Sequence, residues 1–593
     1  MIKFLYLFLF ILFFGIFFSC SSDHKVINEP IIHLRYTEDY TPSYDELIAY
    51  YKKLDDFSDQ TKLIRVGETD AGRPLHLFVI DRDGDFDPIS IREKGKTILF
   101  INNGIHPGEP CGIDGSLLFI DELLRNVDQL KNILRNTTIC IVPVYNVGGH
   151  LNRSAYNRAN QMGPIETGFR GNARNLDLNR DFIKCDSKNA QTFNELFTTW
   201  DPDVFLDTHT TNGSDHQYCI TLIPTNPSAL PGPMDQFLRG IMLPDLYRSM
   251  LETPYEMTPY VVWSNQNPGE GITMTFESGR YSTGYSRLNY TYGFMTENHV
   301  YKSYTDRVQS IFHFIKKLSV FTAEHSKEIL ESRASAIQEA LAAKTYHLDY
   351  AVDTTQFEQL NFKGYESGVM KSQLTGLDRF AYDRSQPFER TIKYYTTFHP
   401  VLSVVKPQYY ILPSAWTEAV DRMKMNGVQM TKFPEDEKLT VDAYFITRLS
   451  NPASPYNGHF FHDTVEVVMR PTEIQVYKND YLIPVNQKKM AYIMECLEPK
   501  ASDSFLRWNF FDSMLDRREY FSPWGFEGNA QKYLDEHPEF KAKWEEERTN
   551  NTAIKTSHYQ QMQYIYSHSE WSEKSFLRYP VYRVENVTFS WAE

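Results

Sequence analysis

The chain has 593 residues, a net charge of −15, 41% apolar residues and 23% charged residues. This length exceeds one ordinary hydrophobic core and predicts two or more domains of about 100–250 residues. The composition excludes a disordered, collagenous or low-complexity chain. The acidic balance provides no global basic surface, so we expect no nucleic acid partner.

An apolar run at residues 4–18 follows Lys3 at the start of the chain. The run is short for a membrane-spanning helix, which needs about 20 residues, and is typical of a secretory signal. A small residue and Cys20 directly after it resemble the bacterial lipobox. That resemblance implies removal of residues 1–19 and acylation of Cys20, giving an exported lipoprotein anchored to the membrane, periplasmic or outer-membrane associated. An ordinary cleaved signal with a chance cysteine is the alternative.

Residues 20–45 are polar and irregular and predict a tether, and an ordered domain is expected over 46–320. We expect strands at 75–80, 97–102, 138–144, 204–208 and 218–223, and helices at 113–125, 188–200, 234–251 and 304–318. Several of these strands are continuous apolar runs, as expected when both faces of a sheet are covered. Strand–helix alternation predicts an α/β layered domain.

A charged, Ala-rich helix is expected at 322–344, within a connecting segment 321–345. Beyond this segment the residue pattern changes from alternating strands and helices to mainly strands. Residues 346–593 predict a second, β-rich domain with helices and few motifs. Strands are expected at 464–469, 473–477 and 482–485, and helices at 413–425 and near 531–547. The two histidines of 458–462 lack a nearby carboxylate, so a loop with stacked aromatics is favoured over a second metal site. The aromatic run 508–511 is expected in a core.

Five cysteines follow Cys20, and none of them forms a CxxC pair. Their odd number and wide spacing argue against a cysteine metal site or a dense disulfide framework. We expect buried free thiols, with at most one disulfide among them. The five are Cys111, Cys140, Cys185, Cys219 and Cys496.

The predicted strand 97–102 runs into a loop that carries His106 and Glu109. A neutral imidazole and a carboxylate at a strand end suit Zn²⁺, which needs a third ligand and an open position for water. His209, at the end of the predicted strand 204–208, is the preferred third ligand. His216 is the competitor, but it follows a polar loop with no strand to fix it.

Charged groups that could act on a substrate follow the first two ligands. Arg170, Arg174 and Arg180 lie within 11 residues, and Asn179 stands beside Arg180. A guanidinium next to an amide is suited to gripping a carboxylate, whereas a solvated charge run is the alternative.

A strand-like run, 294–299, contains Glu297. A carboxylate placed beside the metal could serve as general base. Glu277 has similar flanks and is the rival; we prefer Glu297 because one apolar strand leads into it and the predicted helix 304–318 follows.

Together these motifs resemble the zinc carboxypeptidase family of the carboxypeptidase A type. The resemblance rests on His106-Pro107-Gly108-Glu109, then Leu176-Asp177-Leu178-Asn179-Arg180, a strand-end His and a late strand-end Glu, over roughly residues 40 to 320. It implies an α/β/α sandwich on a mixed, mostly parallel sheet. The remaining 250 or so residues look similar to the tails of uncharacterised bacterial relatives, which implies no function.

The resemblance also implies roles at the metal. His106, Glu109 and His209 would bind one Zn²⁺ per chain. Asp177 would hydrogen-bond His106 and fix its tautomer. Glu297 would take a proton from the attacking water and pass it to the leaving amine.

For the substrate, the resemblance implies that Asn179 and Arg180 grip the terminal carboxylate. Arg170 would polarise the scissile carbonyl, with Arg174 as the weaker candidate. Tyr281 and Tyr285 are both candidates for the family's substrate-capping tyrosine; Tyr285 is carried forward as the substrate-binding residue.

The sequence therefore predicts a zinc-dependent metallocarboxypeptidase that hydrolyses the C-terminal bond of peptides. A cell-wall muropeptide hydrolase of the same fold is an alternative, because the same clamp can hold a diaminopimelate carboxylate. A non-catalytic peptide-binding lipoprotein is another. Side-chain specificity, oligomeric state and the role of residues 346–593 stay open.

Overall fold

A computed structural model of the chain describes residues 29–262, 266–589 and 591. The predicted signal segment 1–19 and the predicted lipidation site Cys20 lie outside the described residues. Within the described part of the chain, no helix combines the length and the apolar character that crossing a bilayer requires.

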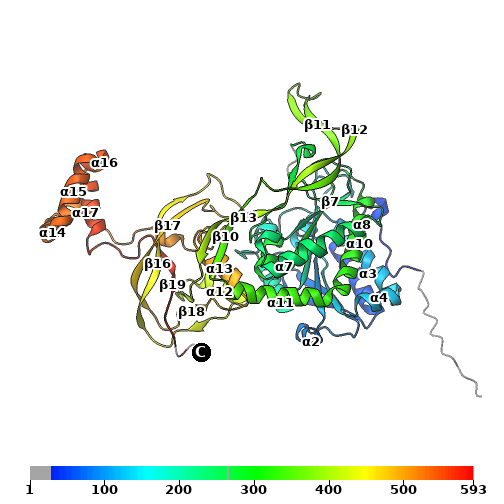
Figure 1. Cartoon of the computed structure of the whole chain (residues 1–593), viewed down its shortest axis with the longest axis horizontal. Helices are drawn as coiled ribbons and strands as arrows, with labels where there is room; N and C mark the ends of the chain where they lie inside the picture. Colours follow the sequence, from blue (N-terminus) through cyan, green and yellow to red (C-terminus); the bar gives the residue numbers. More distant parts are fainter. Residues whose placement is uncertain (1–28, 263–265, 590, 592–593) are drawn as a thin grey trace, which may run out of the picture.

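An eight-stranded sheet in the order β1-β2-β4-β3-β5-β9-β6-β7 forms the centre of the first domain (Figure 1). Its strands are β1 Thr61–Glu68, β2 Pro74–Ile80, β3 Thr97–Asn102, β4 Thr137–Val142, β5 Val204–Thr210, β6 Ile220–Pro224, β7 Met257–Pro259 and β9 Tyr292–Asn298. The four inner strands β4, β3, β5 and β9 are parallel, and β2 and β6 join them antiparallel. The predicted mixed, mostly parallel sheet is therefore confirmed.

Helices cover both faces of this sheet. They are α1 Tyr44–Phe57, α2 Pro88–Glu93, α3 Cys111–Arg125, α4 Val127–Ile133, α5 Val147–Leu151, α6 Lys188–Trp200, α9 Ser282–Leu288 and α10 Tyr304–Glu324. Phe100 of β3 packs its ring against Phe193 of α6 on one face. On the other face α3 and α10 pack together. Every side chain of β3, β4 and β5 is buried, as the continuous apolar runs predicted.

Two helices differ from the predictions in where they begin and end. The predicted helix 304–318 continues to Glu324 because Phe321 and Ala323 extend its buried face, and α11 Ser326–Ala342 begins only after His325. The predicted helix 234–251 consists of α7 Gly232–Phe237, a π-helical turn Leu238–Met242 and α8 Leu243–Met250. Pro244 has no N–H to donate, and the π turn before it accommodates this break in the ladder.

A long hairpin leaves the tail and joins the first domain (Figure 1). It consists of β11 Glu358–Lys371 and β12 Asp378–Tyr395, and β12 pairs in parallel with β8 Ile272–Thr273. Beside it, β10 Thr345–Val352 and β13 Phe398–Val405 form a two-stranded sheet. Part of the segment that the sequence assigned to the second domain is thus bound to the first by strand pairing.

A six-stranded sheet in the order β15-β18-β14-β19-β16-β17 forms the rest of the tail. Its strands are β14 Tyr409–Leu412, β15 Thr431–Lys432, β16 Glu437–Ser450, β17 Thr464–Val476, β18 Tyr481–Pro484 and β19 Arg578–Val584, accompanied by helices α12 Thr417–Met425 and α13 Met490–Leu497. The two predicted strands 464–469 and 473–477 are one strand, β17. Pro471 lies between them, and β17 tolerates it because it is an edge strand.

Four helices between α13 and β19 in the chain form a separate cluster at one end of the molecule (Figure 1). They are α14 Pro523–Glu536, α15 Pro538–Asn550, α16 Thr552–Lys555 and α17 His558–His568, and α14 and α17 share a small apolar core.

Five cysteines of the described chain, Cys111, Cys140, Cys185, Cys219 and Cys496, are all free and buried.

Candidate metal centre and active site

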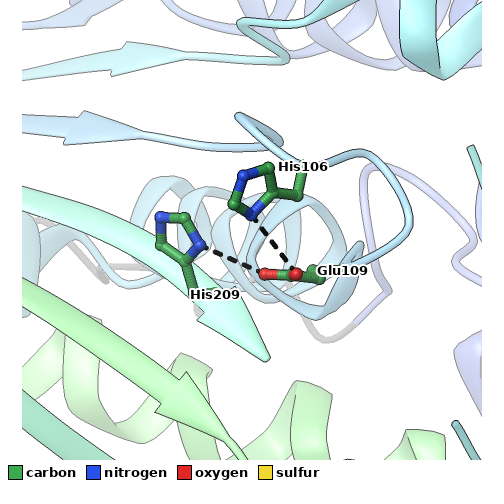
Figure 2. A group of neighbouring side chains, drawn as sticks. All are labelled: His106, Glu109 and His209. Atoms are coloured by element: carbon green, nitrogen blue, oxygen red, sulfur yellow. Dashed lines mark hydrogen bonds and ion pairs between the residues drawn. The ribbon is translucent and has the colours of Figure 1, made fainter. Parts of the chain in front are cut away.

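The side chains of His106, Glu109 and His209 converge at the carboxyl ends of β3 and β5, as Figure 2 shows. Their ligand atoms all lie within 4.8 Å of one another, and all three residues are buried. Glu109 Oε1 lies 3.3 Å from His106 Nδ1, and Glu109 Oε2 lies 3.1 Å from His209 Nδ1. Two neighbouring parallel strands therefore bring together residues 100 positions apart in the chain.

A close approach between α3 and β5 makes this convergence possible. A Cβ on Gly112 would lie 2.0 Å from Thr208 Oγ1, so only glycine permits the first turn of α3 to reach β5. The main-chain N–H of Thr210 then donates to Glu109 Oε2 at 2.8 Å. Gly112 thus holds Glu109 within reach of His209.

Each histidine is oriented by a carboxylate on its far side. His106 Nε2 lies 2.9 Å from Asp177 Oδ1, and His209 Nε2 lies 2.8 Å from Asp207 Oδ2. A carboxylate partner keeps the proton on Nε2 and turns the Nδ1 lone pair toward Glu109. The structure thus brings Asp177 to His106, and Asp207 is a partner that sequence reasoning did not identify.

The donor set fits zinc. His106 Nδ1 is buried and has no hydrogen-bond partner, as expected of an atom reserved for a metal. Two imidazoles and one carboxylate, each held by further hydrogen bonds, are a catalytic zinc set that leaves one position open. Burial opposes ionisation of Glu109, but Arg158, His106 and His209 outweigh it and hold the pKa of Glu109 well below its usual range.

One cavity of about 510 Å³ opens onto these three residues. Its lining includes the other predicted residues Arg170, Asn179, Arg180, Glu277 and Glu297. Arg170 donates to Asp177 Oδ2 through Nε and Nη2, at 3.1 and 2.9 Å. Arg180 lies 4.3 Å from the centre of the Tyr281 ring, and the main-chain N–H of Ser282 donates to Asn179 Oδ1.

Two carboxylates, Glu297 and Glu277, face this cavity and differ in their surroundings. Glu297 is 8% exposed and its Oε2 has no hydrogen-bond partner. Burial, reinforced by the Glu109 and Glu277 carboxylates, raises the pKa of Glu297 to about 8. Glu277 accepts a hydrogen bond from the Thr283 hydroxyl, and burial raises its pKa as well. The carboxylate without a partner is the better placed to exchange a proton.

The placement of Tyr285 corrects its assignment to the substrate. Tyr285 is fully buried on α9, stacks on Phe182 and donates to Asn426 Oδ1 at 2.6 Å, so it packs in the core. The rival Tyr281, four residues earlier and before the first turn of α9, lines the cavity. Residues four apart would share a face within a helix, but Tyr281 is the N-cap of α9 and has an extended backbone (φ −97, ψ 159), so its side chain does not follow the helical repeat.

The other rivals lie away from the ligand group. His216 packs its ring 4.5 Å from that of His299 and is no part of the cluster. Arg174 is exposed and donates to the carbonyl of Asp186. The structure also adds Arg158, which donates to Glu109 Oε1 at 2.7 Å, and Tyr260, which lines the cavity. Neither has a sequence signal, because both lie in loops without a motif.

A buried His-Glu-His group on an α/β sheet, facing a cavity with two further carboxylates and three arginines, defines a metal-dependent hydrolase. Residues 47–215 match the family model described as zinc carboxypeptidase. Residues 47–215 are therefore a zinc carboxypeptidase domain, and the chain is a metallocarboxypeptidase whose cofactor is zinc. The predicted family, class of enzyme and cofactor are therefore confirmed.

Known proteins similar to this chain carry carboxypeptidase names. Carboxypeptidase 2 of Trichophyton rubrum is 22% identical over 437 residues, which cover 69% of this chain and 73% of the fungal protein. Carboxypeptidase 2 of Trichophyton tonsurans is 22% identical over 439 residues with the same coverage.

Among solved structures, a metallo-carboxypeptidase of Pseudomonas aeruginosa matches with a TM-score of 0.37 and 15% identity, covering 49% of this chain and 70% of that one. Carboxypeptidase A of Helicoverpa armigera matches with a TM-score of 0.36 and 16% identity, covering 53% of this chain and 78% of that one.

Proposed function

We propose that this metallocarboxypeptidase removes the C-terminal residue of peptides with a free carboxylate. One observation carries the proposal: the three metal ligands, an unpartnered carboxylate and a cationic clamp all line one cavity. When bound, zinc supplies a Lewis acid that polarises a carbonyl and makes hydroxide available near neutral pH.

Asn179 and Arg180 form the clamp for the terminal carboxylate. The side-chain oxygen of Asn179, Oδ1, accepts the main-chain N–H of Ser282. The two N–H groups of the Asn179 side-chain amide therefore stay available as donors to a substrate. The Tyr281 ring lies against the Arg180 guanidinium and keeps it in place. Holding the carboxylate there fixes which peptide bond meets the ligand group, and such positioning supplies several kcal/mol of the barrier reduction, on the order of 7–11 in the best cases.

Arg170 is the group that receives the oxyanion. Its hydrogen bonds to Asp177 aim the guanidinium into the cavity, 3.7 Å from Glu109 Oε1 at its nearest nitrogen. An oxyanion donor of this kind contributes about 3–4 kcal/mol. Glu297 accepts the proton of the attacking water and later transfers it to the leaving amine.

The test compares matched peptides with a free or an amidated C-terminus. We expect release of the last residue from the free form only, with activity lost on chelation and restored by zinc. Cleavage of both forms would contradict the clamp. Parallel assays on muropeptides decide the cell-wall alternative, and zinc binding without hydrolysis of either class would indicate the peptide-binding alternative.

The export proposal rests on residues 1–20 of the sequence, where an apolar run precedes Cys20. A Cys20→Ser variant is expected to move the protein from the membrane to the soluble fraction, and mass spectrometry of the N-terminal peptide should lose the acyl mass. An unmodified Cys20 in the native protein would leave an ordinary cleaved signal.

A further inference from the structure

The loop between β16 and β17 in the second sheet reaches the active-site segment of the first domain. Asn457 in this loop makes two hydrogen bonds to the main chain of Asp177, 280 residues earlier. The Asp177 N–H donates to Asn457 Oδ1 at 2.8 Å, and Asn457 Nδ2 donates to the Asp177 carbonyl at 3.2 Å. The side-chain amide thus binds both main-chain groups of one residue, and the Asp177 carbonyl also accepts the main-chain N–H of Arg180 at 3.0 Å.

The residue held in this way organises the catalytic site. Asp177 Oδ1 lies 2.9 Å from His106 Nε2, and Asp177 Oδ2 accepts two hydrogen bonds from Arg170. Asp177 Oδ1 also accepts the N–H of Asn179. A shift of the Asp177 main chain would therefore move a metal ligand, the oxyanion group and the carboxylate clamp together.

Further contacts hold the same loop against the same segment. His459 Nε2 lies 2.7 Å from Asp186 Oδ2, and a Cβ on Gly458 would lie 3.5 Å from Leu176, so the loop already lies in van der Waals reach of that segment. Arg280, directly before the cavity residue Tyr281, binds Asp503 of the tail through its main chain and its side chain, and its guanidinium lies 5.5 Å from the centre of the Tyr456 ring in the same loop. The tail therefore contacts two segments that carry cavity residues, one with Asn179 and Arg180 and one with Tyr281.

We propose that Asn457 is a positioning residue, through which the second domain sets the main chain of Asp177 and so the orientation of His106 and Arg170. The inference rests on the proposed function for the role of Arg170, but for His106 it concerns metal binding alone. A carboxylate behind a metal-binding histidine typically changes metal affinity or activity 10–100-fold when it is lost. Removing the Asn457 side chain weakens the support of Asp177 without removing its carboxylate, so we expect metal affinity and activity to fall by the lower part of that range, about tenfold.

The test uses the full chain with Asn457→Gly. Residue 457 has φ +46, so glycine keeps the backbone conformation and removes only the amide. Asn479→Gly is the matched control, since Asn479 also has positive φ, lies in the same sheet's β17–β18 turn and is exposed. We expect zinc affinity, measured by chelator competition, and kcat/KM to fall about tenfold in Asn457→Gly and by less than twofold in the control.

The fall in kcat/KM should come mainly from kcat, because the oxyanion group acts in the transition state, with a smaller rise in KM from the displaced clamp residue Asn179. Unchanged zinc affinity and kcat in folded Asn457→Gly would overturn the proposal. If the wild type lacks carboxypeptidase activity, the proposed function fails while zinc affinity still decides this inference. If Asn457→Gly does not fold, Asn457→Asp replaces it in the test. This variant keeps the acceptor for the Asp177 N–H and loses the donor to the Asp177 carbonyl. Wild-type zinc affinity in Asn457→Asp would also overturn the proposal.

Discussion

His209 and Glu297 are register partners on the neighbouring parallel strands β5 and β9. Paired residues of parallel strands place their side chains on the same face of the sheet. The pairing therefore fixes Glu297 beside a metal ligand without any contact from a loop. Glu277 reaches the same cavity from the segment before α9, where no strand of the central sheet holds it.

We expect Glu297→Gln to lower kcat by at least 10²-fold while zinc content stays at one per chain, because the amide cannot accept the proton. Steady-state hydrolysis and elemental analysis of the same preparation measure both. Glu277→Gln is the matched control and should retain most of kcat. A reversed pattern would move the role of base to Glu277.

Arg174 and Arg180, whose side chains do not hydrogen-bond to Asp177, should differ in their effect on activity. Arg180→Ala is expected to lower kcat/KM for a free C-terminus about 10- to 100-fold, since a charge-assisted hydrogen bond is worth about 1.5–3 kcal/mol. Arg174→Ala removes an exposed guanidinium and should change it by less than twofold. Equal losses in both variants would mean that the segment acts through net charge alone.

Tyr281 and Tyr285 should respond to the same substitution in opposite ways. Tyr281→Phe is expected to lower kcat/KM by up to about tenfold, because the substrate loses one hydrogen bond to the hydroxyl, with the melting temperature unchanged. Tyr285→Phe removes the hydrogen bond to Asn426 and should cost about 1 kcal/mol of stability with kcat/KM unchanged. Loss of activity without loss of stability in Tyr285→Phe would contradict the core assignment.

Asp114 makes the stability of the first domain depend on pH. Its carboxyl is buried between the hydroxyls of Thr41 and Tyr304, and burial raises its pKa to about 7 from the ordinary value of 3.8. The folded state thus holds the proton more tightly than the unfolded state. This contribution is complete below about pH 4 and is lost as the pH rises through 7, by as much as about 4 kcal/mol.

Asp114→Asn mimics the protonated form and should flatten that dependence. Melting temperatures of the wild type and the variant, measured at pH 4.5 and pH 7.5, test this directly. We expect the wild type to lose more stability than Asp114→Asn over this interval. Asp128→Asn, an exposed change on the neighbouring helix α4, should leave the wild-type dependence intact.

The metal site could be predicted from the sequence because strand ends mark it. His106 follows the apolar strand β3 and His209 lies near the carboxyl end of β5, and neighbouring parallel strands bring their carboxyl ends to one edge. Arg158, Tyr260 and Asp207 could not be predicted in the same way. The first two lie in loops, and the role of Asp207 depends on which ring nitrogen of His209 faces inward.

The strand boundaries and long-range contacts of the tail could not be predicted, for a different physical reason. Its strands are half exposed, so their residue patterns carry weak information on where a strand ends, as the merging of 464–469 and 473–477 into β17 illustrates. The contacts of Asn457 and of the β11–β12 hairpin link positions far apart in sequence. A single amino-acid sequence gives no indication of which distant positions pair.

The five buried thiols of the described chain have a practical consequence. Since none of them forms a disulfide, reducing agents should leave the melting temperature unchanged, whatever the redox conditions of the compartment. Burial raises the pKa of Cys111, Cys140 and Cys185, which keeps their thiols protonated and slow to react. Cys140 lies in the central sheet and Cys496 in helix α13 of the tail, so thiol labelling followed by peptide mapping would report separately when each part of the molecule opens.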